Sequence, residues 1–144
     1  MNIRQIYVVS DSTGETAERV VRATLLQFPE HKARIRVFTR VRNKDMVGDV
    51  IRRANDNGAM IVFTLVDSEL RKYCYHFAQE QGVEVVDVIG AIITKVSTFL
   101  DAAPLNRPSA DQPLSEEYFR RVAAIEFAVK SDDGKEPRNL GKAD

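Results

Sequence analysis

Short runs of apolar residues alternate along the chain with segments whose apolar residues recur at helical spacing. The runs predict strands near residues 4–9, 34–41, 59–66 and 83–88. Helical patterns lie between them, with Pro29 ending the first, Gly58 capping the second and Gly82 ending the third, and a fourth pattern covers residues 89–99. Alternating strands and helices are typical of a parallel sheet with helices on both faces.

Two of the predicted strands differ in pattern. The run AMIVFTLV is apolar throughout, as a strand buried on both faces should be, whereas ARIRVFTRVR alternates and carries Arg34, Arg36, Arg40 and Arg42. We interpret these arginines as a solvated edge whose charge prevents pairing with another strand. The predicted fold is an α/β, Rossmann or flavodoxin-like domain with an open, mostly parallel sheet of about four strands in the order 2-1-3-4.

The pattern of apolar and polar residues changes after residue 101. The segment DAAPLNRPSADQP has three prolines and no period, which predicts a loop, and the next segment has a helical stripe with Ser115 as its cap. We predict an α/β domain, a Pro-rich loop, a C-terminal helix packed on the same domain and a linker, over residues 1–101, 102–114, 115–134 and 135–144.

Composition narrows the class of protein. Lys plus Arg equal Asp plus Glu at 21 each, so net charge indicates neither nucleic acid nor an anionic membrane as a partner. The single cysteine, Cys74, cannot form an internal disulfide, and MNIRQIYVV does not have the form of a signal peptide. No apolar run is long enough to span a membrane. We therefore expect a cytoplasmic protein.

The stretch YVVSDSTGETAERVV runs from a predicted strand into a predicted helix. One interpretation of its turn is structural. Ser12 and Glu15 fit the capping-box spacing, in which a hydroxyl and a carboxylate each accept a hydrogen bond from a backbone N–H at the helix start. That role accounts for these two residues but leaves the rest of the turn unexplained.

A second interpretation is an anion site. The turn lies at the carboxyl edge of the sheet, where open α/β proteins bind ligands, and a helix N-terminus there offers free N–H groups to a phosphate. The loop after the third strand, TLVDSELR, should emerge beside it; Asp67 or Ser68 could equally cap a helix, and Arg71 could hold a phosphate or be solvated. The candidates for the cleft are Ser10, Asp11, Ser12, Thr13, Gly14, Glu15, Thr16, Thr64, Asp67, Ser68 and Arg71.

Other kinds of site fit the residues poorly. Ser12 in SDST could be a hydrolase nucleophile, but His31 and His76 are the only histidines and neither stands in the D-x-x-H arrangement of such enzymes. One cysteine and two separated histidines predict no metal site. The turn lacks the glycines of a dinucleotide site, and no Walker sequence is present. The residues alone predict a phosphate-sized anion site without naming a reaction.

Three stretches together resemble a known family. YVVSDSTGETAE, TLV…ELR and YFRRVAAIEFAVKSDDGKEP are similar to the amino-terminal half of the pyruvate, phosphate dikinase regulatory proteins and of their relatives that act on phosphoenolpyruvate synthase. The resemblance extends from about Ile6 to Asp144, and SDSTGETAE is more similar to the dikinase-directed branch.

The resemblance implies a bifunctional regulator. Such proteins use ADP to phosphorylate a threonine of the target enzyme, and they remove that phosphate with inorganic phosphate, releasing pyrophosphate. The family has two α/β domains in a homodimer and a phosphate-binding loop in the second domain.

On this resemblance we interpret the chain as the amino-terminal domain, inactive alone. The resemblance assigns no catalytic residue to any position of this chain. It implies no cofactor for this fragment, and ADP and inorganic phosphate for the full-length protein. Two alternatives are a stand-alone flavodoxin-like anion-binding module and a non-catalytic dimerisation or docking domain.

Overall fold

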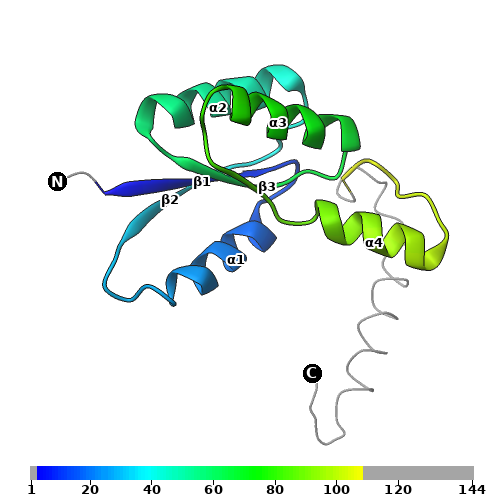
Figure 1. Cartoon of the computed structure of the whole chain (residues 1–144), viewed down its shortest axis with the longest axis horizontal. Coiled ribbons are helices and arrows are strands. Elements are labelled where there is room, and N and C mark those ends of the chain that lie inside the picture. Colours follow the sequence, from blue (N-terminus) through cyan, green and yellow to red (C-terminus); the bar gives the residue numbers. More distant parts are fainter. Residues whose placement is uncertain (1–2, 109–144) are drawn as a thin grey trace, which may run out of the picture. The chain divides into compact units, whose positions relative to one another are not determined.

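The computed structural model describes residues 3–108, which form an open parallel sheet with helices on both faces (Figure 1). The strands are β1 (Arg4–Ser10), β2 (Ala33–Phe38), β3 (Met60–Thr64) and β4 (Val85–Asp87). The helices are α1 (Glu15–Leu25), α2 (Lys44–Asn57), α3 (Ser68–Glu80) and α4 (Gly90–Leu100). All strand pairs are parallel in the order β2-β1-β3-β4, which confirms the predicted fold.

Some predictions lie outside this part of the chain. The expected C-terminal helix and linker, residues 115–144, are not among the described residues. The predicted loop is irregular over residues 102–108, as far as it is described. No helix within residues 3–108 has both the length and the apolar character that crossing a membrane requires.

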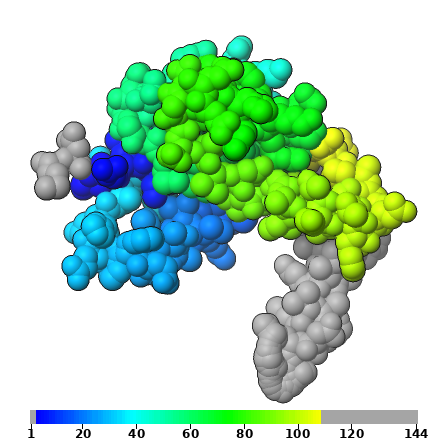
Figure 2. Space-filling model, viewed as in Figure 1, coloured from blue at the N-terminus to red at the C-terminus, as the bar shows by residue number. Residues whose placement is uncertain are grey.

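The central strands are buried on both faces because helices cover each. The helices α2 and α3 cover one face and α1 the other, as the ribbon and the space-filling view both show (Figures 1 and 2). Successive side chains of a strand point to opposite faces, so Tyr7 and Phe63 pack toward α2 and α3, whereas Val8 and Val62 pack toward α1.

The strand β2 lies at one edge of the sheet, as the alternating pattern predicted. Arg34 and Arg36 are exposed, and the guanidinium carbon of Arg36 lies 4.9 Å from the centre of the Phe38 ring. The strand ends at Phe38 rather than near residue 41, because the chain turns away at Arg40, whose φ is 51°.

The helix α4 has the predicted apolar pattern, yet its apolar side chains are exposed within the described part of the chain. Ile92 is 61% exposed, Phe99 87% and Leu100 62%, and Gly90 is the buried residue of this helix. Periodicity therefore predicted the helix correctly but gave no information on what covers it.

Candidate functional site

The strands β1 and β3 end side by side at the carboxyl edge of the sheet. Ser10 is the last residue of β1, Thr64 is the last residue of β3, and the two are partners in the parallel register. The chain moves from β1 toward one edge of the sheet and from β3 toward the other, so the strand order reverses between them. Open α/β sheets bind ligands at such a switch point.

A cavity of about 250 Å³ opens at this switch point. The turn supplies most of its lining, and Val66, Ile89 and Pro108 complete it. The predicted site residues that line this cavity, which we call the switch-point pocket, are Ser10, Asp11, Ser12, Thr13, Gly14, Glu15, Thr16 and Thr64. The structure thus brings the whole turn and the end of β3 to one hollow.

Three consecutive residues after β2 hold the turn through its carbonyl groups. The N–H of Arg40 donates to the carbonyl oxygen of Ser12 and the N–H of Val41 donates to that of Ser10, both at 2.9 Å. The Nε of Arg42 donates to the carbonyl oxygen of Asp11 at 2.9 Å. Arg42 is exposed, as expected of a solvated edge, and its guanidinium also binds the turn.

Asp11 ties the turn to the loop after β3. It is 6% exposed, and its Oδ2 accepts a hydrogen bond from the N–H of Val66 at 2.8 Å. Its own N–H donates to the carbonyl oxygen of Thr64 at 3.4 Å. Since Arg42 binds the same residue, Asp11 connects the loops that follow three neighbouring strands and fixes the floor of the pocket.

The helix α1 starts without the predicted capping box. Its N-cap is Gly14, with φ 84°, and no side chain caps the helix. Ser12 lies too early in the chain to cap it, and its N–H instead donates to the Oγ of Ser10 at 2.9 Å. The first intrahelical bond runs from the N–H of Glu18 to the carbonyl of Gly14, so the N–H groups of residues 15–17 have no intrahelical acceptor.

The three remaining candidates lie apart from the switch-point pocket. Asp67 caps α3, since its Oδ1 accepts hydrogen bonds from the N–H groups of Glu69 and Leu70, which confirms the capping interpretation. Ser68 and Arg71 line a neighbouring cavity of about 230 Å³ beside α4.

Arg71, which we predicted either to hold a phosphate or to be solvated, binds two backbone carbonyl groups while it lines the neighbouring cavity. Its Nη1 donates to the carbonyl oxygens of Leu65 and Val66 at 3.2 and 2.8 Å, and its Nε lies 3.9 Å from Oδ2 of Asp87. The guanidinium therefore holds the loop after β3 in place.

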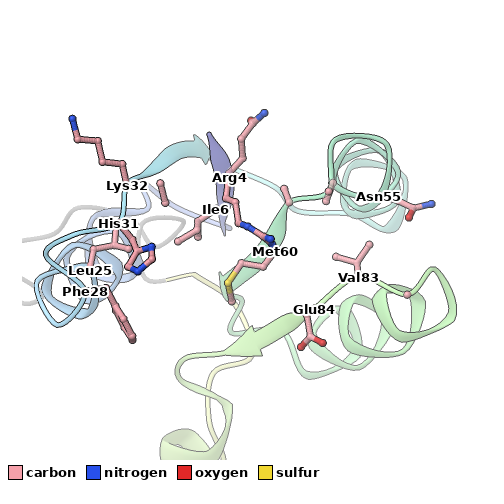
Figure 3. A pocket seen from close by; sticks show the side chains of 16 residues that line it. Arg4, Ile6, Leu25, Phe28, His31, Lys32, Asn55, Met60, Val83 and Glu84 are labelled. Carbon is pink, nitrogen blue, oxygen red and sulfur yellow. The ribbon is translucent and has the colours of Figure 1, made fainter. Parts of the chain in front are cut away.

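The two histidines do not approach Ser12. His76 is an exposed residue of α3, and His31 lines a different cavity, of about 430 Å³, at the amino edge of the sheet. There, His31 and Phe28 lie on one side and Val83 on the other, with Met60 between them (Figure 3). The described residues thus give Ser12 no histidine as a base. Among the same residues, no three His, Cys, Asp or Glu side chains form a possible metal site.

Sequence reasoning missed four residues of the site: Arg42, Val66, Ile89 and Pro108. The position of Arg42 just beyond the second predicted strand indicated that it lies at the same edge of the sheet as the turn. Val66 acts through its backbone N–H, and Ile89 and Pro108 arrive from later segments, so no motif marks them.

A comparison with protein families identifies the chain's relatives. The model of one family, described as kinase/pyrophosphorylase, matches residues 6–144. The chain belongs to this family. The turn and the switch-point pocket thus lie within the matched segment of a kinase/pyrophosphorylase family member.

Several curated members of this family are similar in sequence. The chain is 55% identical over 139 residues to a putative pyruvate, phosphate dikinase regulatory protein of Sorangium cellulosum, covering 96% of this chain and 50% of that protein. Proteins of the same name from a Geobacillus species and Geobacter sulfurreducens are 44% and 41% identical, over 100% and 99% of the chain and 54% and 53% of their own lengths. The chain spans about half the length of these relatives.

Proposed function

We propose that this chain is the amino-terminal half of a bifunctional regulator of pyruvate, phosphate dikinase. The regulator uses ADP to phosphorylate a threonine of the dikinase, and it uses inorganic phosphate to remove that phosphate as pyrophosphate. The observation that carries the proposal is the family match over residues 6–144, together with the names of relatives that are 41–55% identical to this chain over the aligned residues. Phosphoenolpyruvate synthase is the alternative target, and the full-length protein is expected to act as a cytoplasmic homodimer.

The switch-point pocket supports a share in this chemistry. Phosphoryl transfer depends on positioning the reactants and neutralising charge, because the protein contributes little covalent chemistry. A helix start with free N–H groups, beside hydroxyl side chains, can bind a phosphate, and the carboxylate side chains can accept a hydrogen bond from the hydroxyl of the target threonine. The proposed role of the pocket is to complete the cleft that the second half of the full-length protein builds around its phosphate-binding loop.

The experiment is a pair of substitutions in the full-length protein. Asp11→Asn removes the charge of the buried carboxylate while keeping its shape, and Thr13→Ala removes an exposed hydroxyl at the rim. Both turnovers are measured, ADP-dependent phosphorylation of the dikinase and phosphate-dependent release of pyrophosphate. We expect each variant to lose at least about tenfold in one direction or both, the scale of a lost hydrogen bond to a charged group.

Matched controls separate chemistry from folding. Asp56→Asn and Thr24→Ala make comparable changes at exposed positions of α2 and α1, away from the pocket, and should turn over normally. Melting temperatures of all four variants are compared with that of the parent. Unchanged turnover in both directions for Asp11→Asn and Thr13→Ala would remove the pocket from the mechanism. Absence of both activities in the parent protein would refute the proposed function itself.

One observation favours a second candidate, a docking or dimerisation domain. The helix α4 exposes apolar side chains at Ile92, Val96, Phe99 and Leu100 within the described part of the chain. Exposed apolar patches mark interaction sites in soluble proteins. In the full-length protein, Phe99→Asp would weaken dikinase binding or dimer formation under this candidate and leave both unchanged under the first.

A further inference from the structure

Two buried hydroxyl groups lie under the start of α1. Ser10 and Thr64 are register partners at the ends of adjacent strands. Their side chains alternate with the neighbouring positions, so they share the face of Val8 and Val62, the residues that pack against α1. Both line the switch-point pocket, with Ser10 3% exposed and Thr64 7% exposed.

Neither hydroxyl group donates a hydrogen bond within the described structure. The Oγ of Ser10 accepts a hydrogen bond from the N–H of Ser12, but within residues 3–108 it donates none. The hydroxyl of Thr64 has no hydrogen-bond partner among the same residues. A buried polar group without a partner costs stability, so native proteins retain such groups where water or a ligand satisfies them.

The helix start adds donors at the same place. The N–H groups of residues 15–17 have no intrahelical acceptor, and no side chain caps them. Gly14, the N-cap, lies over Ser10: a Cβ placed on Gly14 would be 3.7 Å from the Cβ of Ser10. Hydroxyl and amide donors therefore converge on one hollow at the positive end of the helix dipole.

We propose that the switch-point pocket binds a phosphoryl group, held by the hydroxyls of Ser10 and Thr64 and by the first N–H groups of α1. A tetrahedral phosphate offers several acceptor oxygens to such a set of donors. The group is either free inorganic phosphate or the phosphate ester of a phosphothreonine, which share this chemistry. The inference deepens the proposed function, since both are reactants of the proposed dephosphorylation, but it concerns binding alone.

The charges at the pocket limit the affinity. Asp11 and Glu15 line it, and their carboxylates oppose an anion. The carboxylate of Asp11 accepts a hydrogen bond from the N–H of Val66, and the guanidinium of Arg42 lies at the backbone carbonyl of the same residue. Both contacts reduce the repulsion between Asp11 and an anion. The side chain of Glu15 is exposed, so solvent screens its charge. We therefore expect millimolar binding by this chain alone and tighter binding where the second half of the full-length protein adds cations.

Amide shifts in a labelled sample of this 144-residue chain test the proposal. The chain is titrated with sodium phosphate, with a phosphothreonine blocked at both ends, and with sodium chloride at matched ionic strength. We expect saturable shifts confined to residues 12–17 and 64–66 with one or both phosphate probes and none with chloride. Tighter binding of the blocked phosphothreonine would identify the ester as the preferred source, and tighter binding of inorganic phosphate would identify the free ion.

Substitution of the hydroxyl gives the decisive comparison. Thr64→Val keeps the shape of the side chain and should weaken phosphate binding at least about tenfold, as expected for a lost hydrogen bond to a charged group. Its melting temperature should stay the same or rise, since a buried unpaired hydroxyl is removed. Thr24→Val makes the same change on the last turn of α1 and should bind normally.

A second variant provides an independent test in case Thr64→Val does not fold. Ser10→Ala removes the other hydroxyl and should weaken binding in the same way. No saturable shift with either phosphate probe, or equal affinity in the parent, Thr64→Val and Ser10→Ala, would overturn the inference and leave a buried water as the partner of the hydroxyls. Because the test involves no turnover, these results are independent of whether the full-length protein regulates the dikinase.

Discussion

Gly14 meets two constraints that no other glycine within residues 3–108 combines. Its φ is 84°, in the left-handed region, and a Cβ there would lie 2.7 Å from Cγ1 of Val37. Gly58 has φ 65° but open space around the position of a Cβ. Gly14→Ala should lower the free energy of unfolding by roughly 2–4 kcal/mol, the sum of backbone strain and overpacking, whereas Gly58→Ala should cost about 1–2 kcal/mol.

Urea unfolding of the two variants measures this difference. Both carry the same chemical change and the same class of backbone strain, so the excess cost at Gly14 reports its contact with Val37. Equal costs would show that β2 shifts to accommodate the methyl group and that the turn is less tightly held than the contacts of Arg40, Val41 and Arg42 indicate.

Cys74 is expected to be chemically inert in the folded protein. Burial, and secondarily the charge of Asp87, raises the pKa of its thiol from 9.0 to about 12. The thiolate is the reactive form, so at pH 8 the folded protein should react with a disulfide reagent about 1000-fold more slowly than the urea-unfolded chain. Fast labelling of the folded protein would show that α3 opens locally.

The same shift of the pKa has a consequence for stability. The folded state favours the neutral thiol, so its contribution is complete below pH 9 and is lost as pH rises toward 12. The difference in unfolding free energy between the parent and Cys74→Ala should therefore shrink as the pH is raised from 9 to 11.

The opening turn shows which residue-level features a sequence conveys. Asp67 was predicted as a possible cap because the sequence places it one residue before a helix, and it is the cap. Ser12 and Glu15 fitted a capping box equally well, yet the carbonyl of Ser12 is bound by the N–H of Arg40, and the helix begins at Glu15. A local pattern could not reveal that contact, because its donor lies 28 positions later in the sequence.

At the scale of elements, Asp87 joins the start of α4 to α3. Its Oδ1 accepts hydrogen bonds from the N–H groups of Ile89 and Gly90, and its Oδ2 lies 3.9 Å from Nε of Arg71. These hydrogen bonds join the first turn of α4, where its buried residue Gly90 lies, to the end of β4. Asp87→Ala should lower the free energy of unfolding by about 1–2 kcal/mol and speed amide exchange across residues 90–100.

Asp67→Ala provides the matched control for this prediction. It removes the cap of α3 at a comparable cost of about 1 kcal/mol, but it should leave exchange in α4 unchanged. Slow exchange of α4 in Asp87→Ala would show that another contact holds the helix.

The sequence pattern predicted where a strand lies in the sheet better than it predicted where the strand ends. The alternating strand is β2 at the edge, as predicted, but it ends at Phe38. A positive φ at Arg40 is unusual for a residue with a side chain, so no propensity predicts it. Here the three hydrogen bonds from residues 40–42 to the turn offset that strain, and they depend on the assembled sheet.

At the scale of the whole molecule, the order of strands was predictable from burial. The apolar run through Ile61 and Phe63 had to be central, and the run with Arg34 and Arg36 had to lie at an edge. That order placed the switch point between β1 and β3, and with it the pocket. Arg71, in contrast, was a candidate ligand by its charge alone, and only the folded loop shows its guanidinium bound to two carbonyl groups.

The last prediction concerns which half of the full-length protein is needed for phosphoryl transfer. This chain spans about half the length of its relatives. Under the proposed function, the phosphate-binding loop lies in the other half. Residues 1–144 alone should therefore show no transfer of label from radiolabelled ADP to the dikinase, while the full-length protein transfers it. Transfer by residues 1–144 at a rate close to that of the full-length protein would contradict this division, and it would make the switch-point pocket itself the catalytic site.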